Sequence, residues 1–389
     1  MPIVNRIADL QPDMVEWRHD FHRHPELSFD VHRTAGIVAD RLRAFDCDEV
    51  VEGIGQTGVV GIIRGRASAS GKVIGLRSDM DALPIPEVTG ADHASTIPGK
   101  MHACGHDGHM AMLLGAARYL AETRNFDGSV AVIFQPAEEE GGGGEKMVED
   151  GMMDRFGITE VYGMHNMPTL PVGAFAIRSG PTLASTDEFT ITITGKGGHA
   201  AKPHLNIDTT LIASQIIIGA QSITSRNLDP AQMMVVSICS LSTEGDSHNV
   251  IPNTAALTGT VRCYSEENRA MARERLDAIV HNTCAGFGAT ADVHWTRGYP
   301  AMINAHDQAT FAADIADEVA GGCLRDIPSN LGAEDFAYML EVRPGAMIMV
   351  GNGDSAECHH PAYDFADETM PAGASFWVRL AERAMPLED

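Results

Sequence analysis

KVIGL at residues 72–76 and SVAVIF at residues 129–134 are short apolar runs with the length and composition of buried strands. Between them, residues 106–120 read HDGHMAMLLGAARYL and carry apolar side chains at helical spacing. A strand, a helix and a second strand in this order are typical of a parallel sheet with a crossover helix. In such sheets functional groups gather in the loops at the carboxyl ends of the strands.

A different pattern begins near Thr186, where EFTITITGKG (188–197) alternates strictly between apolar and polar residues. It is followed by a helix-like run (208–225), a β-rich run (233–241), a strand (255–264), a long amphipathic helix (266–285) and a last strand (290–295). This order fits a ferredoxin-like α+β unit of about a hundred residues. We therefore predict an α/β domain (1–185 and 298–389) with a mixed, largely parallel sheet flanked by helices, and an inserted ferredoxin-like α+β domain (186–297).

Length and charge limit the classes of function. A chain of 389 residues exceeds what one compact core usually holds, which agrees with two domains. With 28 basic and 53 acidic side chains, the formal net charge is -25. An extended phosphate-binding surface is therefore not expected, and we predict no nucleic-acid partner. The same charge would repel an anionic substrate, so a bound carboxylate needs a local group of donors.

The cysteine pattern and the lack of long apolar stretches indicate a protein of a reducing, aqueous compartment. The seven cysteines are odd in number and scattered, as expected of free thiols in cytosol, and six of them are expected to carry no chemistry. The N-terminal segment does not have the pattern of a secretion signal. No stretch approaches about 18 consecutive apolar residues. We predict a cytoplasmic protein without a membrane partner.

Residue types that bind metals are concentrated in a few short segments. They are GLRSDMDALP (75–84), MHACGHDGH (101–109), FQPAEEEGGGG (134–144), GMHNMP (163–168) and ECHHPAYDF (357–365). The first places Asp79 and Asp81 directly after a strand, on one side of a locally extended backbone. The second packs three histidines, a cysteine and an aspartate at the start of a helix.

The glutamate run Glu138–Glu140 is the strongest indication of a cation. Three adjacent carboxylates at the end of a core strand are unfavourable because each raises the pKa of the others, and a divalent ion removes that cost. Imidazole, thiolate and carboxylate together suit zinc, manganese, cobalt or nickel better than calcium or magnesium. Each segment alone also has an ordinary explanation as a core histidine, a solvated loop or a turn cap. All of these explanations would have to hold at once, so we predict a metal site.

Several segments of the chain resemble those of a known family. The matching segments, in order, are HRHPELSF, RSDMDALP, MHACGHDGHMAMLLGAA, FQPAEE, GMHNMP, GKGGHAAKPH, NVIPNTAALTGTVR, AEDFAYML and HHPAYDF. They resemble the aminoacylase-like metallopeptidases, in the branch of hippurate hydrolases, N-acyl amino acid amidohydrolases and plant auxin-conjugate hydrolases. The match runs nearly from end to end, and MHACGHDGH is highly specific.

The resemblance implies two divalent transition-metal ions (manganese, zinc, cobalt or nickel), a few ångströms apart. The positions that match the family's ligands are Cys104, His106, Glu139, His165 and His359. Cys104 lies at the mouth of the predicted helix, and a helix N-terminus favours the thiolate form of a cysteine. Because the family has a single histidine two residues before proline, His360 is the alternative to His359.

The resemblance also implies catalytic roles. Glu138 matches the general base, which takes a proton from the attacking water and later returns one to the leaving amine. Counting from the glycine run instead of from Pro136 would shift this role by one residue, because Glu140 stands where the family has glycine. Asp81 is implied to orient a side chain that binds metal. The role of Asp79 stays open.

In the family the inserted domain is a lid and a dimerisation surface, which implies a homodimer or homotetramer. His199 is implied to reach a neighbouring subunit's active site and to donate a hydrogen bond to the carbonyl oxygen as charge develops on it. Asn253 and Arg262 could receive the carboxylate of the substrate. For Arg262, a salt bridge on the surface of a strand is an equal alternative.

The predicted activity is metal-dependent hydrolysis of the amide bond of small N-acyl amino acids, such as hippurate, to a carboxylic acid and a free amino acid. The alternatives are a dipeptidase or aminopeptidase with the same dinuclear site, and a non-catalytic metal-binding homologue. A thiol-redox role for Cys104 is disfavoured because the chain has no C-x-x-C pair there.

Overall fold

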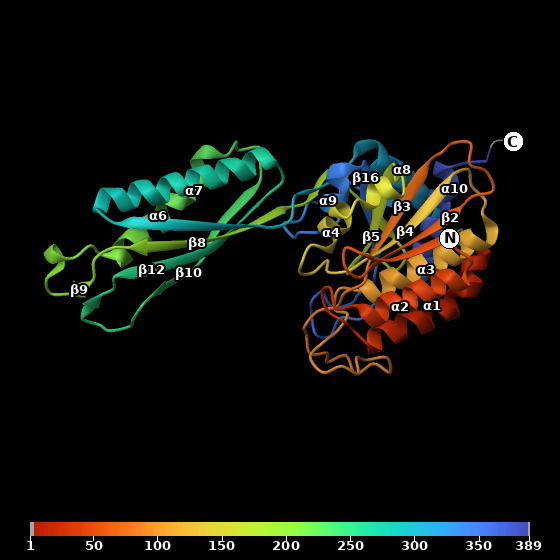
Figure 1. Cartoon of the computed structure of the whole chain (residues 1–389), viewed down its shortest axis with the longest axis horizontal. Helices are drawn as coiled ribbons and strands as arrows, with labels where there is room; N and C mark the ends of the chain where they lie inside the picture. The colour runs from red at the N-terminus through yellow and green to blue at the C-terminus, as the bar shows by residue number, and fades with distance from the viewer. Residues whose placement is uncertain (1–3, 388–389) are drawn as a thin grey trace. The chain divides into compact units, whose positions relative to one another are not determined.

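The computed structural model describes residues 4–387, which form two compact units (Figure 1). Unit 1 contains the residues up to Gly180, Ile303–Ser329 and the residues from Glu334 onward, and unit 2 contains Pro181–Met302 with Asn330–Ala333. Unit 1 is therefore built from separate stretches of the chain. None of the helices in the described part of the chain combines the length and apolarity needed to cross a membrane.

Unit 1 is built on an eight-stranded sheet with the strand order β1-β2-β4-β3-β5-β16-β6-β15. The strands are β1 (Glu49–Ile54), β2 (Gly58–Arg64), β3 (Val73–Asp79), β4 (Ser129–Gln135), β5 (Glu160–Met167), β6 (Phe175–Ile177), β15 (Cys323–Arg325) and β16 (Gly345–Gly351). The four central neighbours β4, β3, β5 and β16 are parallel, whereas β1, β2 and β6 add antiparallel pairs. The predicted mixed, largely parallel sheet is confirmed.

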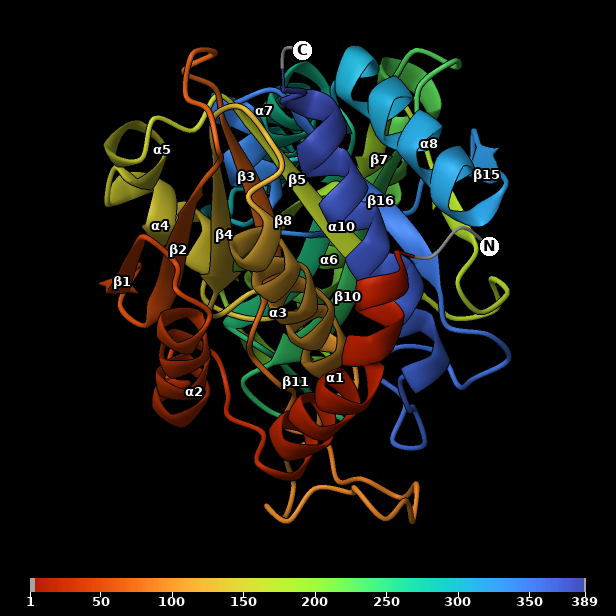
Figure 2. The ribbon, with the colours of Figure 1, turned by 90° about the vertical axis from the view of Figure 1, so that its right-hand side faces the viewer.

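Helices cover this sheet. Figure 2 shows α2 (His32–Ala44), α3 (His106–Thr123), α8 (His306–Ala320) and α10 (Met370–Ala384) across one face, with α1 (Asn5–Arg23) packed on α3. The first half of α3 is buried on all sides, since its apolar run HMAMLLGAA has no polar face and lies between the sheet and α1 and α10. Short elements complete the chain: α4 (Gly143–Glu149), α5 (Met152–Arg155), α9 (Ala337–Val342), β7 (Gly180–Leu183), β14 (Met302–Asn304) and a 3-10 turn at Asp367–Thr369.

Unit 2 has the predicted ferredoxin-like order. Its elements are β8 (Ser185–Thr194), α6 (Thr209–Ser222), β10 (Met234–Thr243), β12 (Thr254–Cys263), α7 (Glu266–Phe287) and β13 (Thr290–Arg297), and the antiparallel sheet has the order β10-β12-β8-β13. Alternate residues of β8 are buried, as its alternating sequence predicts. Figure 1 shows α6 and α7 on one face of this sheet. A separate ladder joins β9 (Gly198–His199) to β11 (Val250–Ile251), next to a 3-10 turn at Pro203–Leu205.

Several boundaries differ from the sequence-based expectation, and unit 2 spans Pro181–Met302 where 186–297 was predicted. The helix predicted to reach residue 225 ends at Ser222 and continues as a π-helical turn, Ile223–Asn227. The strand predicted over 290–295 extends to Arg297 because β8 still offers pairing partners there. Asn330–Ala333 belongs to unit 2 instead of the first domain, since the N–H of Asn330 donates to the Thr182 carbonyl at 2.9 Å.

Candidate metal centre

Most of the predicted donor residues lie at one edge of the sheet in unit 1. The segments that carry them follow or end the four adjacent parallel strands: β3 ends at Asp79, β4 is followed by Glu138 and Glu139, and β5 carries His165 near its end. His359 lies in the loop after β16, and Cys104 and His106 lie where α3 begins. The carboxyl ends of neighbouring parallel strands meet at one edge, so residues far apart in sequence are brought together.

Cys104, His106 and His165 form the first group, with one sulfur or nitrogen atom of each within 4.8 Å of the others. Cys104 Sγ lies 3.3 Å from His165 Nε2, and His165 Nδ1 is 2.6 Å from the carbonyl of Asn166. Gly105, between two of these residues, has a φ of 85°, and a Cβ there would meet Asn166 Nδ2 at 2.5 Å. Only glycine fits this left-handed, crowded position, which lets Cys104 and His106 share one side.

Glu139 joins this group to His359. Atoms of Cys104, Glu139 and His359 also lie within 4.8 Å of one another, and His359 Nε2 is 3.2 Å from Glu139 Oε1. His359 and His360 are both exposed, but the Nδ1 of His360 accepts a hydrogen bond from the N–H of Ala362. Glu140 is also exposed, so only two of the three adjacent glutamates face the cluster. The geometry thus places His359, and not His360, among the donors.

His106 tests whether a cation fits this cluster. The side chain is fully buried, and Nδ1 is 2.7 Å from the carbonyl of Asp81, whereas Nε2 has no hydrogen-bond partner within residues 4–387. Carboxylate oxygens of Asp79, Glu138 and Glu139 lie 3.7–3.9 Å from Nε2, too far for hydrogen bonds. Burial alone would lower the pKa of His106, but the surrounding carboxylates raise it to about 10. The environment therefore favours positive charge, and the donor set suits a divalent transition metal.

His109, another histidine of the MHACGHDGH segment, has a different role. His109 is buried, its Nδ1 is 2.7 Å from Asp79 Oδ1, and its Nε2 accepts a hydrogen bond from the N–H of Asn166 at 2.9 Å. Both ring nitrogens are thus engaged by the protein. Asp79 also accepts a hydrogen bond from Arg77 at 2.9 Å, so this carboxylate joins β3 to the start of α3.

Asp81 holds the turn that carries the two glutamates. Its Oδ1 accepts a hydrogen bond from the N–H of Glu138 at 3.0 Å, and its Oδ2 accepts one from the N–H of Glu139 at 3.2 Å. Its own carbonyl oxygen contacts His106 Nδ1, which orients that ring. Asp81 is buried and touches two donor residues without being part of the donor groups.

Glu138 lies at the junction of the donor cluster and a second group of acids. Its oxygens come within 4.8 Å of those of Glu334 and Asp335, all three side chains being buried. Burial, together with repulsion from Glu334 and Glu139, raises the pKa of Glu138 well above its ordinary value. Arg77 lies among these acids with four polar partners. The sequence patterns assign no role to the AEDF segment (333–336) or to Arg77.

Without a bound cation, the surroundings of Cys104 oppose its thiolate form. The neighbouring Cys358, burial and the nearby Glu139 raise the pKa of Cys104 well above its ordinary value. The pKa of Cys358 falls to about 6, chiefly through its contact with Cys104. Cys358 is a second thiol at the centre, and its place next to His359 in the ECHHPAYDF segment was the one sequence signal for it.

The three residues predicted in the inserted domain are all in unit 2. His199 is exposed in β9, and its Nδ1 accepts a hydrogen bond from the N–H of Ala201 at 3.1 Å. Asn253 is exposed and accepts from the N–H of Gly197 at 2.9 Å. Arg262 is partly buried in β12 and has no ion-pair partner within the described residues, so the alternative salt bridge is not observed.

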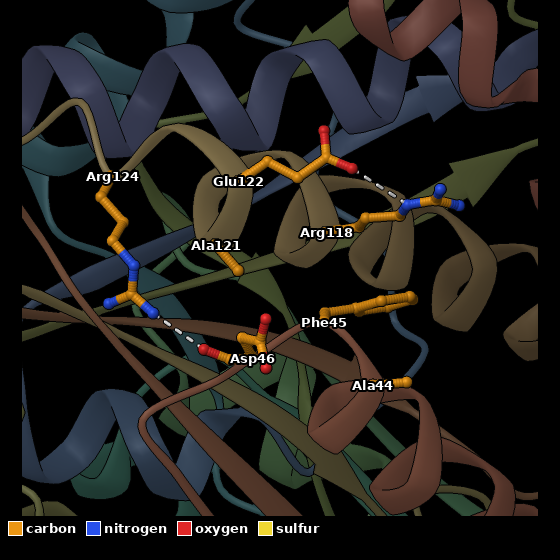
Figure 3. Close-up of a pocket in the computed structure, with 7 residues that line it drawn as sticks. All are labelled: Ala44, Phe45, Asp46, Arg118, Ala121, Glu122 and Arg124. Atoms are coloured by element: carbon orange, nitrogen blue, oxygen red, sulfur yellow. Dashed lines mark hydrogen bonds and ion pairs between the residues drawn. The ribbon is translucent and has the colours of Figure 1, made fainter.

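A separate surface hollow of about 700 Å³ lies between the ends of α2 and α3. Figure 3 shows its lining residues, which are Ala44, Phe45, Asp46, Arg118, Ala121, Glu122 and Arg124. Its two guanidinium groups are already engaged: Arg118 pairs with Glu122 and Asp13, and Arg124 pairs with Asp48. None of the predicted site residues lines it, so this hollow is not the candidate site.

Comparisons with known proteins identify the family. A family model described as "Peptidase family M20/M25/M40" matches residues 75–383. The chain is 39% identical to an N-acetylcysteine deacetylase of Bacillus subtilis (strain 168), covering 95% of this chain and 96% of that protein. It is 37% identical to a hippurate hydrolase of Campylobacter jejuni, covering 98% of this chain and 99% of that protein.

A solved structure supports the same family assignment. The crystal structure of the Bacillus subtilis YXEP protein, described as a dinuclear metal-binding peptidase of family M20, superposes with a TM-score of 0.85 at 35% identity, covering 97% of this chain and 99% of that one. The predicted resemblance is confirmed, and with it a metal-dependent amide hydrolase as the class of enzyme. The chain belongs to peptidase family M20/M25/M40.

Proposed function

We propose that the protein hydrolyses the amide bond of small N-acyl amino acids and releases a carboxylic acid and a free amino acid. The observation that carries this proposal is end-to-end similarity to a hippurate hydrolase, together with a donor cluster in unit 1 that suits divalent metals. A hippurate hydrolase and an N-acetylcysteine deacetylase both have names that specify an acylated amino acid. The compounds that these two names specify share an amide bond next to a free carboxylate.

The donor cluster supports a pair of divalent ions. We assign as ligands the residues whose donor atoms group together, namely Cys104, His106, Glu139, His165 and His359. Ions bound there would polarise the scissile carbonyl and acidify a nearby water molecule. Because the set mixes sulfur, nitrogen and oxygen, manganese, zinc, cobalt and nickel all fit, and the identity of the metal stays a prediction.

Glu138 is the acid–base residue in this proposal. It is next to Glu139 in sequence and adjacent to the cluster, and its carboxylate oxygens approach those of Glu334 and Asp335. A carboxyl group with a raised pKa can accept a proton from the attacking water and deliver one to the leaving nitrogen. Asp81 supports both glutamates through their backbone N–H groups.

The roles of unit 2 stay predictions. Exposed His199 and Asn253 are available to a ligand or to a second copy of the chain, which is compatible with a lid that also forms a homodimer or homotetramer. Arg262 has no ion-pair partner in the described chain and could receive a substrate carboxylate. The seven cysteines are free in the structure, which supports the proposed cytoplasmic location.

A small substrate panel tests the proposal. Purified protein supplied with manganese, cobalt or zinc is assayed on N-acetyl, N-benzoyl and longer N-acyl amino acids, and on dipeptides with a free amine. We expect turnover of the N-acyl compounds and little turnover of the dipeptides. Turnover of only the dipeptides would assign the site to a peptidase instead, and binding of metal without turnover of either group would indicate a non-catalytic homologue.

A further inference from the structure

Arg77 has no role in the proposed chemistry, yet it is one of the most completely buried charges in unit 1. Its side chain is inaccessible to solvent, and it extends from β3, two residues before Asp79. Nε donates to Gln135 Oε1 at 2.9 Å, Nη1 to Asp79 Oδ2 at 2.9 Å and Nη2 to Asp335 Oδ1 at 3.1 Å. Nη2 also lies 3.0 Å from Glu334 Oε1.

Two of these partners hold the ends of the segment 136–143, which contains Glu138 and Glu139. Gln135 directly precedes it, and its Nε2 donates to Asp335 at 2.7 and 2.9 Å. At the other end, the N–H of Gly144 donates to Asp335 Oδ2 at 2.8 Å. One carboxylate thus binds both ends of the segment, and Arg77 binds both Asp335 and Gln135.

The middle of the segment 136–143 is held by residues at the end of β3. Asp81 accepts hydrogen bonds from the N–H groups of Glu138 and Glu139, two residues after Asp79, which is fixed by Arg77. We propose that Arg77 is a positioning residue, which holds the segment 136–143 so that Glu138 and Glu139 face the donor cluster. This inference rests on the proposed function only for its effect on catalysis.

A purely electrostatic role is the main alternative. Oxygens of Glu138, Glu334 and Asp335 lie within 4.8 Å of one another, an arrangement that could also hold a cation. Arg77 is within 3.1 Å of two of these acids and supplies that positive charge. If charge were all that mattered, lysine would replace it. A lysine ammonium cannot reproduce the planar fork that contacts four groups at once, so Arg77→Lys separates the two roles.

The experiment compares Arg77→Lys and Asp335→Asn with the wild type and with Lys72→Gln. Lys72 immediately precedes the same strand and forms an ordinary ion pair with Glu160 at 2.8 Å, so it controls for the loss of a charge pair. Hydrogen–deuterium exchange of the peptides that cover residues 136–144 is measured first. We expect exchange at least about tenfold faster in Arg77→Lys and Asp335→Asn, and unchanged in Lys72→Gln. This readout needs no substrate.

Metal content and steady-state kinetics follow. At saturating metal, where a weaker hold of Glu139 on the ions is offset, we expect each variant to retain the metal content of the wild type, with kcat about 100-fold lower and KM within about twofold for Arg77→Lys and Asp335→Asn. Wild-type exchange of residues 136–144 in Arg77→Lys, or a wild-type kcat in that variant, would overturn the proposal. If the wild type hydrolyses none of the panel, the proposed function fails, and the exchange result alone decides the role of Arg77.

Discussion

The two units present their functional residues in opposite ways. In unit 1, Cys104 and His106 are buried, and their donor atoms lie within a few ångströms of other donors that come from distant segments, although His359 is exposed. In unit 2, His199 and Asn253 are exposed, and their side chains accept hydrogen bonds from the backbone N–H groups of Ala201 and Gly197. Both sets were singled out by motifs of similar length in the same sequence.

The difference shows what each set needs in order to act. Burying carboxylates and imidazoles together is costly unless a counter-charge is bound, so the cluster in unit 1 is explained by a ligand that fits inside it. The exposed residues of unit 2 require no such partner and are compatible with contact to something that arrives from solution. Unit 1 should therefore govern metal binding, and unit 2 should affect turnover only.

Glu138→Gln should produce the largest effect. Glutamine keeps the shape of the side chain but cannot take up a proton, so kcat should fall by about 10³-fold or more while the metal content stays the same. Steady-state assays and elemental analysis of the purified variant measure both quantities. Glu140→Gln is the matched control, because Glu140 is exposed, and it should behave as wild type. A loss of activity in Glu140→Gln alone would assign the role of general base to Glu140 instead of Glu138.

His199→Ala should lower kcat by about 100-fold, as expected for the loss of one hydrogen-bond donor to a developing oxyanion. Metal content and melting temperature should not change, because the side chain is exposed and its Nδ1 accepts a hydrogen bond from the N–H of Ala201 at the surface. His204→Gln, in the same exposed loop region, serves as the control and should retain activity. Unchanged kcat in His199→Ala would remove unit 2 from the chemistry.

Cys104→Ala should weaken metal binding by about 10–100-fold, with little change in the melting temperature of the metal-free protein. Isothermal titration with manganese or zinc measures the affinity, and calorimetry measures the melting. Cys284, a thiol buried in unit 2, provides the comparison, and Cys284→Ala should bind metal as wild type does. If Cys104→Ala melts early while its metal affinity is intact, Cys104 is only a core residue.

The last prediction concerns stability instead of activity or metal affinity, and it involves the pH and a buried histidine of unit 1. Burial opposes protonation of His22, but Asp107 at 2.8 Å and Glu87 at 3.4 Å raise its pKa from 6.5 to about 9. The resulting stabilisation, roughly 3 kcal/mol, is complete below pH 6.5 and is lost as the pH rises through 9. The other groups that face this ring are Arg18, His93 and His102.

Denaturant unfolding between pH 6 and pH 10 measures this effect, with His22→Gln as the comparison. The free energy of unfolding of the wild type should decrease over this range more steeply than that of the variant. Equal slopes would show that folding does not raise the pKa of His22.

Much of the fold was predictable because its signals are local. The apolar runs at 72–76 and 129–134 and the alternation in β8 each report on a few neighbouring residues, and these elements formed where they were expected. The boundaries were less predictable where pairing decided them, as at Arg297, which continues β13 only because β8 is long enough to pair with it.

The candidate site was predictable to the extent that its residues are chemically unusual in context. Cysteine and histidine in MHACGHDGH stand out without a structure. Arg77 does not, since an arginine inside a strand is ordinary until the fold brings Asp335 beside it. The same holds for the exposure of Glu140, which depends on the backbone turning at Gly141 and Gly142.

The central claim is that distant side chains of unit 1 bind a shared pair of divalent ions. A crystal structure of the manganese-loaded protein, with anomalous data collected at a wavelength where manganese scatters, tests it most directly. We predict two anomalous peaks, each within coordination distance of ligands from the set Cys104, His106, Glu139, His165 and His359. Peaks at other residues, or a manganese-saturated protein in which these side chains contact no ion, would contradict the account.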